Sequence, residues 1–234
     1  MLRRLAFFLG IPALEPESCF LWIHAYILFP VEHMYNGLTR FFRNRDQLKT
    51  LEYLVIPEIV KKKEGYDSPV LRIWSAGCST GEEPYSIAML CREILPVNFT
   101  IRITGTDINN ASLTTAKKGF YSAEITSDVP ARFLERYFDV KPGGFRLRGS
   151  IRDTVRYAQQ NLTAGSGLSR QDIVLLRNVN IYYDKSTQQE ILNEVRKSMD
   201  SCSYLFIGEA ESIFGLHAGF EFVYTDWSVL YRKC

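Results

Sequence analysis

The sequence lacks several features that would assign a class of protein at once. Its 234 residues include five cysteines and three histidines, with no C-x-x-C pair and no histidine spacing typical of a metal site. The dinucleotide-binding pattern G-x-G-x-x-G is also absent. An odd number of scattered cysteines excludes a disulfide framework and favours a reducing, cytoplasmic compartment. We expect no metal ion.

Neither charge nor hydrophobicity is concentrated enough to define a partner. The chain has 28 lysines and arginines against 26 acids, a net charge of +2, which does not predict nucleic-acid binding. Its most apolar stretch, residues 19–31, contains His24 and Pro30 and is shorter than the ~20 residues of a bilayer span. We expect this stretch to pack as a helix on the main domain and not to insert into a membrane.

The first chemical signal lies in residues 71–88. Residues 71–75 alternate like a short strand, and Gly77 and Gly81 then bracket a turn where the backbone can take positive φ and approach a ligand closely. A helical pattern follows, and the spacing of Thr80 and Glu83 predicts a capping box at its start. A strand, a glycine turn and a helix N-terminus form the ligand-binding corner of many α/β sheets.

Two acids in the first turn of this helix argue against a phosphate ligand. Glu82 and Glu83 would repel a pyrophosphate, but they suit a ligand that carries an ammonium or sulfonium group. Asp107, at the end of the next expected strand, is placed to accept the hydroxyl groups of a ribose. The alternative is an ordinary strand–helix junction whose acids complement the helix dipole.

Strands alternate with helices along the rest of the chain, which predicts an α/β fold with a doubly wound, mostly parallel sheet. The expected strands are 71–75, 99–107, 155–160, 172–179 and 204–208, with a terminal antiparallel pair at 221–224 and 227–232. The strand at 172–179 is almost wholly apolar and should be central.

Two helices and one insertion complete this reading. We expect helices at 110–119 and 186–199, the second begun by a capping box of Ser186 and Gln189. Prolines, aromatic residues and a glycine pair mark 120–150 as a small inserted subdomain with a hairpin. The sequence suggests a helical N-terminal region over residues 1–63 and a sheet domain over 64–234.

Five segments, in this order, resemble the chemotaxis receptor methyltransferase family (CheR-type). They are 39–43, 74–88, 105–108, 161–162 and 177–184. The likeness extends over most of the chain, and five motifs in order are far more specific than any one of them. Members of this family use S-adenosylmethionine to methylate glutamates of chemoreceptors. The resemblance therefore implies a class I methyltransferase fold, this cofactor, and receptor helices as the protein substrate.

The resemblance also implies a set of cofactor-binding positions. They are Thr39, Arg43, Gly77, Glu82, Asp107, Asn161, Leu162, Leu176, Arg177 and Asn178. By this match, Glu82 holds the methionyl ammonium group, with Glu83 as the alternative, and Asp107 holds the ribose. Asn161 and Leu162 flank the adenine.

The remaining implied roles concern methyl transfer itself. The segment 176–178 faces the sulfonium, and Arg43 and Tyr182 are the implied catalytic residues. We expect Arg43 to hold a carboxylate and Tyr182 to fix the acceptor oxygen with a hydrogen bond. A glutamate carboxylate, with a pKa of about 4.3, is ionised at neutral pH, so the reaction needs no general base.

Three positions depart from the family pattern. Gly37 stands where an asparagine is expected, Asn180 replaces an apolar residue, and residues 208–211 read G-E-A-E in place of G-H-S-E. These departures keep two alternatives open. One is a methyltransferase with another protein or a small carboxylate as acceptor, and the other is a cofactor-binding module without turnover.

Overall fold

The computed structural model describes residues 39–216 and 219–233. The expected helix at 19–31, and the N-terminal region up to residue 38, lie outside the described residues. Residues 39–234 form one compact unit. The division that the sequence suggested after residue 63 falls inside this unit, because Leu51, Val55 and Ile59 belong to the same hydrophobic core as Ile73 of the sheet.

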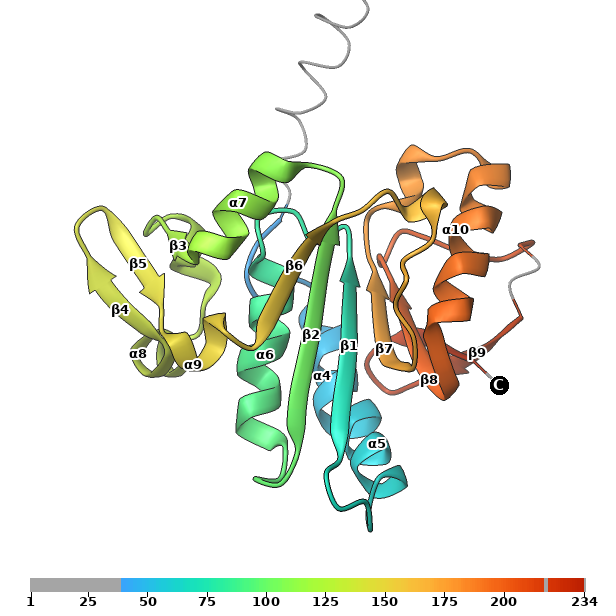
Figure 1. Ribbon diagram of the computed structural model, residues 1–234, viewed down its shortest axis with the longest axis horizontal. Helices are drawn as coiled ribbons and strands as arrows, with labels where there is room; N and C mark the ends of the chain where they lie inside the picture. The colour runs from blue at the N-terminus through green and yellow to red at the C-terminus, as the bar shows by residue number, and fades with distance from the viewer. Residues whose placement is uncertain (1–38, 217–218, 234) are drawn as a thin grey trace, which may run out of the picture. The chain divides into compact units, whose positions relative to one another are not determined.

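A seven-stranded sheet organises this unit, in the order β6-β2-β1-β7-β8-β10-β9 (Figure 1). The strands are β1 (Val70–Ala76), β2 (Thr100–Asp107), β6 (Val155–Gln159), β7 (Gln171–Leu176), β8 (Met199–Ile207), β9 (Phe220–Tyr224) and β10 (Val229–Lys233). The first five are parallel, and β10 runs antiparallel to both β8 and β9. The predicted doubly wound, mostly parallel sheet is confirmed.

Helices cover the two faces of the sheet unequally. The helices beside this sheet are α4 (Arg45–Thr50), α5 (Ile56–Lys62), α6 (Glu82–Ile94), α7 (Asn110–Lys118) and α10 (Lys185–Ser198), with a π-helical segment, Leu51–Val55, between α4 and α5. Helices α4, α5 and α6 lie behind the sheet in Figure 1, and α10 lies in front of β7 and β8. Each side has its own apolar core, because alternate residues of a strand point to opposite faces.

The strand β7 is the most deeply buried, with all six residues inaccessible, as its apolar sequence predicted. It ends three residues earlier than expected, since the chain leaves the sheet after Leu176. Helix α7 also follows its sequence signals. The Asn109 side chain accepts hydrogen bonds from the amides of Ala111 and Ser112, and Gly119 ends the helix at a φ of 57°.

Both predicted capping boxes are wrong. Helix α6 begins after Gly81 with no side-chain cap, because the hydroxyl of Thr80 donates to the carboxylate of Glu82. Helix α10 is capped by Asp184, which accepts from the amide of Thr187. In both cases a neighbouring polar residue changes the expected pairing, which spacing alone did not reveal.

A small second sheet stands in the segment where the sequence predicted an insertion. It has the order β3-β5-β4, formed by β3 (Phe120–Tyr121), β4 (Phe138–Lys141) and β5 (Gly144–Leu147). The short helices α8 (Ala131–Tyr137) and α9 (Gly149–Arg152) flank it. Strands β4 and β5 form the expected hairpin, and Gly144 is required there because a Cβ atom would collide with the carbonyl oxygen of Tyr121.

Candidate active site

The order of the strands reverses at β1, and we call the region at the carboxyl ends of β1, β2 and β7 the crevice. From β1 the chain continues to β2 and β6 on one side, whereas β7 and β8 lie on the other. In open parallel sheets this switch point is where ligands bind. The three loops that leave β1, β2 and β7 at this edge contain most of the candidate residues.

The glycine turn after β1 is fixed on both sides. Gly77 has a φ of 79°, and its amide and that of Cys78 both donate to the carbonyl oxygen of Thr106, at 2.7 and 2.9 Å. A Cβ atom on Gly77 would overlap the Val179 side chain, which comes from the loop after β7. Gly77 therefore supports the turn and lets two loops of the crevice meet.

A tyrosine cluster supports the second half of this turn. A Cβ atom on Gly81 would lie 2.8 Å from the hydroxyl of Tyr157 and 3.0 Å from that of Tyr121. Tyr121 donates to the carbonyl of Thr80 at 2.7 Å. Burial raises the pKa of Tyr121 and Tyr157 well above the ordinary value, so both remain neutral. Sequence patterns could not predict this cluster, because its members come from separate elements.

Glu82 is the buried acid of the site. Only 1% of its surface is exposed, and its carboxylate accepts hydrogen bonds from the Thr80 hydroxyl at 2.7 and 2.8 Å and from the Thr39 side chain. Burial raises its pKa above the ordinary 4.5, and the hydrogen bonds offset part of that shift. A carboxylate held in this way, and unpaired with any cation that the structure describes, is suited to receive a positively charged group.

Glu83, the neighbouring acid, is already neutralised within the protein. Its carboxylate accepts from the Ser75 hydroxyl at 2.6 Å and pairs with Arg177, whose Nε lies 2.7 Å away. Both side chains are largely buried, 4% exposed for Arg177 and 14% for Glu83. The geometry thus separates the two acids that the sequence left as alternatives. Glu82 forms no ion pair among the described residues.

Arg177 uses its side chain to join elements of the protein. Besides the ion pair to Glu83, its guanidinium donates to the Gln47 side chain at 3.0 Å and to the carbonyl of Arg43 at 3.3 and 3.4 Å. Gln47 in turn donates to the carbonyl of Ile207 at 2.7 Å. Although the sequence suggested that Arg177 faces the sulfonium, these contacts direct its side chain toward α4 and α6.

The segment 39–43 is anchored by its two phenylalanines. Phe41 packs edge-on against Tyr121 with ring centroids 4.9 Å apart, and the amide of Phe42 donates to the Ser86 hydroxyl at 2.9 Å. This anchoring brings Thr39 to Glu82 and places Arg43 beside Arg177. Burial, followed by the charge of Arg177, lowers the pKa of Arg43 from its ordinary value.

Asp107 stands at the end of β2 with both carboxylate oxygens in use. One accepts from the amide of Ser79 at 2.7 Å, and the other accepts from the amide of Asn109 at 2.9 Å. The first bond ties the end of β2 to the glycine turn. Since each carboxylate oxygen can accept more than one hydrogen bond, Asp107 keeps the capacity to bind a pair of hydroxyls.

The loop after β7 is held by an acid that the sequence analysis did not assign. Asn178 has a φ of 59°, and its amide and that of Gly208 both donate to one oxygen of Glu211, at 2.8 and 2.6 Å. A Cβ atom on Gly208 would lie 2.8 Å from the Asn178 side chain. Gly208 and Glu211, the two positions of 208–211 that match the family pattern, thus fix the backbone at 178.

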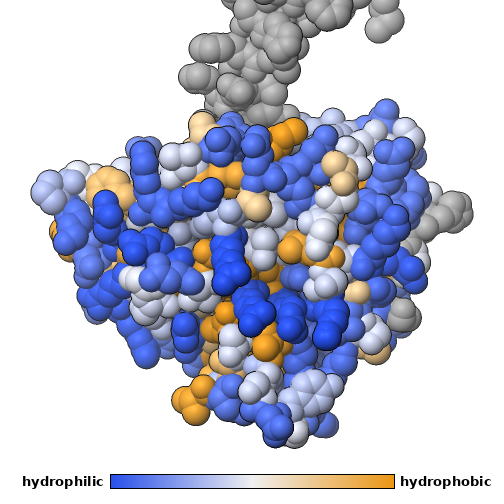
Figure 2. Space-filling model, viewed as in Figure 1, coloured by the Kyte–Doolittle hydropathy of each residue, from blue (hydrophilic) through white to orange (hydrophobic). Residues whose placement is uncertain are grey.

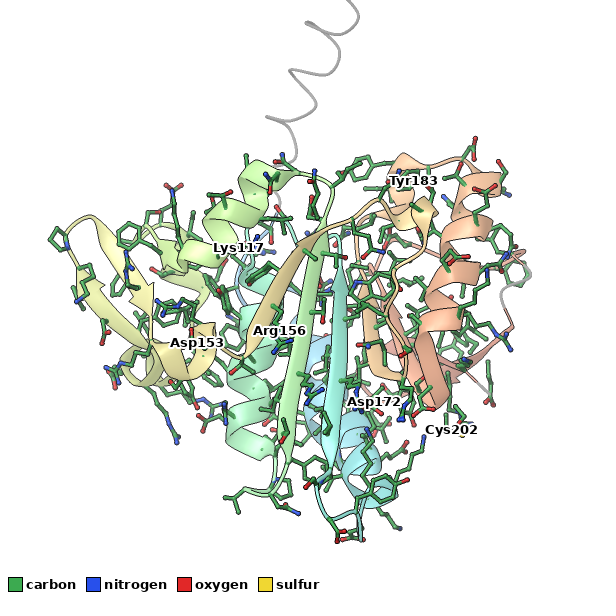
Figure 3. The ribbon with its side chains drawn as sticks, viewed as in Figure 1. Lys117, Asp153, Arg156, Asp172, Tyr183 and Cys202 are labelled. Carbon is green, nitrogen blue, oxygen red and sulfur yellow. The ribbon has the colours of Figure 1, made fainter. Side chains whose placement is uncertain are left out.

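Of the remaining candidates, two lie at the surface and two are buried. Tyr182 is 47% exposed in a short 3₁₀ turn, Asn180–Tyr182, and Figure 3 shows the next residue, Tyr183, at the end of the molecule where α10 begins. Asn161 is exposed, and its side chain accepts from the amide of Thr163 at 3.1 Å. Leu162 is buried in the core beside α10, as is Leu176.

Two of the predictions concern a metal site and a membrane-spanning helix, neither of which the sequence led us to expect. Within 39–216 and 219–233, no group of three or more histidine, cysteine or acidic side chains could hold a metal ion. No helix in the same residues has both the length and the apolar character to cross a membrane.

The strand order, the crevice at β1 and the acids around it define a class I S-adenosylmethionine-dependent methyltransferase fold. Residues 37–229 match the model of the family described as CheR methyltransferase, SAM binding domain. The chain therefore belongs to the CheR methyltransferase family, and S-adenosylmethionine is the cofactor of its domain. The resemblance that the motifs predicted is confirmed.

The chain is also similar to individual proteins of other organisms. The chain is 32% identical over 210 residues to chemotaxis protein methyltransferase 1 of Pseudomonas aeruginosa, covering 86% of this chain and 76% of the relative. It is 34% identical over 179 residues to an uncharacterised 104.1 kDa protein of Rhodobacter capsulatus, covering 75% of this chain but only 19% of that protein. A solved structure, magnesium protoporphyrin IX methyltransferase of Synechocystis with bound S-adenosylmethionine, is 13% identical with a TM-score of 0.43, covering 95% and 99% of the two chains.

Proposed function

We propose that this protein transfers the methyl group of S-adenosylmethionine to glutamate side chains of methyl-accepting chemotaxis proteins, forming glutamate methyl esters. The observation that carries the proposal is Glu82, a buried carboxylate that is hydrogen-bonded by two threonines and pairs with no cation among the described residues. The relatives named as chemotaxis methyltransferases support the choice of acceptor. Such an acceptor implies a cytoplasmic site of action.

The residues at the crevice fit this cofactor. Glu82 would receive the methionyl ammonium, because the positive charge removes the cost of keeping the buried carboxylate ionised. Asp107 would accept the ribose hydroxyls at the end of β2, the usual place for such an acid. Gly77 lets the backbone approach the ligand closely. Asn161 and Leu162 would line the adenine, and the backbone of 176–178 would face the sulfur.

When bound, S-adenosylmethionine supplies an electrophilic methyl group on a sulfonium and leaves as S-adenosylhomocysteine. The acceptor is an ionised glutamate, so the protein has no proton to remove. Its task is to align a carboxylate oxygen with the methyl carbon and to exclude water. Orientation of this kind can contribute on the order of 7–11 kcal/mol.

Two residues are placed to orient the acceptor. Arg43 carries a positive charge at the crevice, and its backbone is held by Arg177. Tyr182 belongs to the exposed turn beyond β7 and can donate a hydrogen bond to the acceptor oxygen. We assign both residues to positioning of the glutamate carboxylate. Neither is assigned as a base or as a nucleophile.

The test is transfer of labelled methyl groups to the cytoplasmic fragment of a methyl-accepting chemotaxis protein. We expect label on glutamate that is released as methanol by mild base, because methyl esters are base-labile. Base-stable label would instead indicate another acceptor group. Binding of S-adenosylhomocysteine without any transfer would indicate a cofactor-binding module.

A further inference from the structure

One face of the main sheet has no helix over half of its width. In front of the sheet α10 packs on β7 and β8, but Figure 1 shows no described helix in front of β6, β2 and β1. Helix α6 packs against these strands from the other side. A parallel sheet of this kind normally has both faces covered. No described helix covers this half of the sheet, although Trp74 of β1 points to the same side and is buried.

Three arginines project from this open face, one from each strand. Arg72 of β1 and Arg102 of β2 are direct register partners, and Arg156 of β6 is the register partner of Thr104. Residues 102 and 104 point to the same face, opposite to the buried Ile103. Neighbouring strands lie about 5 Å apart, so the three side chains form a compact group. We call Arg72, Arg102 and Arg156 the arginine face.

The pictures show the same concentration of polar groups. Figure 2 has strongly hydrophilic side chains at the centre of this view, over β6, β2 and β1. In Figure 3 the labelled Arg156 lies over β6 and β2. Arg102 and Arg156 are exposed, and Arg72 is half-buried.

No acid among the described residues pairs with these three charges. The nearby acids are already occupied, since Asp172 pairs with Lys63 and Asp153 pairs with Arg152. Like charges on neighbouring strands destabilise a sheet. Their arrangement is consistent with an external anion.

The spacing of the arginines suits a helix. Thr104 and Ala158, front-facing residues of β2 and β6, have short side chains, and Trp74 of β1 is buried with its indole nitrogen donating to Thr106 at 2.9 Å. A helix carries acids at i and i+4 about 6 Å apart, which matches the separation of arginines on adjacent strands. The charge also selects an acidic helix over a basic one.

The arginine face is within reach of the crevice. Arg102 precedes Asp107 by five residues of β2, a distance of about 16 Å along the strand. A helical segment of about a dozen residues spans that distance. We propose that the arginine face docks an acidic helical segment of the methyl-accepting protein, outside the glutamate that is methylated. This rests on the proposed function.

A general polyanion fits less well. The whole chain carries a net charge of only +2, so its surface lacks the basic excess typical of nucleic-acid binding. The three arginines without an ion pair lie together on one half of a sheet face. Such a local patch selects and orients a partner that has few acids at fixed spacing.

The test compares two variants that lose the same charge. One is Arg72→Gln/Arg102→Gln/Arg156→Gln. The matched control is Lys61→Gln/Lys117→Gln/Lys118→Gln, three exposed lysines on α5 and α7. We expect the arginine variant to raise the KM for a receptor cytoplasmic fragment at least tenfold at low salt. Its kcat and its affinity for S-adenosylhomocysteine should be unchanged, and the control should match wild type. An unchanged KM in the arginine variant, or an equal rise in the control, would overturn the proposal.

A binding measurement makes the test independent of turnover. The full chain is titrated into fluorescein-labelled poly-L-glutamate, and we expect the arginine variant to bind at least fivefold more weakly than wild type and control. Equal binding by all three would overturn the proposal even if no acceptor is methylated. If the triple variant melts early, the double variant Arg102→Gln/Arg156→Gln replaces it, since both side chains are exposed.

Two further probes exclude other partners. A labelled DNA duplex and vesicles containing phosphatidylglycerol are offered to the same proteins. Loss of DNA or vesicle binding in the arginine variant, with an unchanged KM for the receptor fragment, would contradict the assigned partner. Failure of wild type to methylate the fragment at all would count against the proposed function, whereas the poly-L-glutamate comparison would still decide the docking surface.

Discussion

The two sides of the crevice are built differently. On the donor side, formed by the loops after β1 and β2, Gly77, Glu82 and Asp107 are each fixed by hydrogen bonds or by close packing within the protein. On the acceptor side, the turn beyond β7 exposes Ile181 and Tyr182.

This difference indicates which of the two ligands, the cofactor or the protein substrate, has a preorganised site in the free protein. A small cofactor benefits from groups held in place before it binds, because little ordering then has to occur on binding. A protein substrate can supply part of its own site. We infer that the donor side is complete in the free protein, whereas the acceptor side is completed by the incoming chain.

The largest expected effect comes from the residue that joins the two sides. Arg177→Met would leave Glu83 as a buried, uncompensated charge, and we expect a loss of stability of about 3–5 kcal/mol. Denaturant unfolding measures this. The double variant Arg177→Met/Glu83→Gln should recover most of the loss.

Arg136→Met is the control, since its pair with Glu93 is exposed and contributes at most about 1 kcal/mol. If Arg177→Met kept wild-type stability and lost only cofactor affinity, Arg177 would contact the cofactor and would not join the two sides of the crevice.

The next effect tests the fixed geometry of the donor side. Gly77→Ala puts a side chain at a φ of 79° and against Val179, so we expect at least a hundredfold loss of affinity for S-adenosylhomocysteine by calorimetry. Gly143→Ala is matched in φ, at 82°, but has open space around it. It should lose about 1 kcal/mol of stability and no affinity. Equal affinity in both variants would show that the turn is free to adapt.

A smaller effect concerns pH. Because burial raises the pKa of Glu82, its carboxylate becomes fully ionised only above its ordinary range, and a cationic group favours the ionised form. Affinity for S-adenosylhomocysteine should therefore rise with pH until Glu82 is ionised, by about tenfold per unit of pKa shift, with protons released on binding.

The stability of the unbound protein should change with pH in the opposite direction, falling as pH rises. A raised pKa means that the Glu82 contribution is present at low pH and is lost as pH rises through the folded-state pKa. Calorimetry and unfolding across pH 4 to 8 measure both trends. Glu82→Gln should remove the pH dependence of both the affinity and the stability. A wild-type affinity as flat as that of the glutamine variant would remove Glu82 from the ammonium site.

The smallest expected effect is that of a substitution on the acceptor side, and it concerns turnover. Tyr182→Phe removes one hydrogen-bond donor, so we expect kcat to fall roughly tenfold, with cofactor affinity and thermal stability unchanged. Steady-state methyl transfer measures the change. The neighbouring Tyr183→Phe should behave like wild type. Equal rates for both variants would show that Tyr182 does not position the acceptor.

Local signals in the sequence predicted much of the fold. The apolar run of β7 predicted a central strand, and Asn109 and Gly119 end α7 as their chemistry dictates. These features depend on neighbours within a few residues. The two predicted capping boxes failed for a related reason. The Thr80 hydroxyl donates to Glu82, and Asp184 caps α10 in place of Ser186.

Long-range partnerships could not be predicted in this way. Arg177 and Gln47 lie 130 residues apart, and the acid that holds the loop at Asn178 comes from position 211. Motif matching identified Glu82 and Asp107 as candidates. It could not show that Glu83 is neutralised by Arg177 and Ser75, which requires knowledge of where β7 lies beside β1.

The most direct test of the account is calorimetric titration of the full chain with S-adenosylhomocysteine, for wild type and Asp107→Ala. We predict that wild type binds one equivalent and that the variant binds at least tenfold more weakly, because the ribose hydroxyls lose their acceptor at the end of β2. Wild-type protein that bound neither S-adenosylhomocysteine nor S-adenosylmethionine would contradict the account, since the donor side of the crevice would then hold no methyl donor.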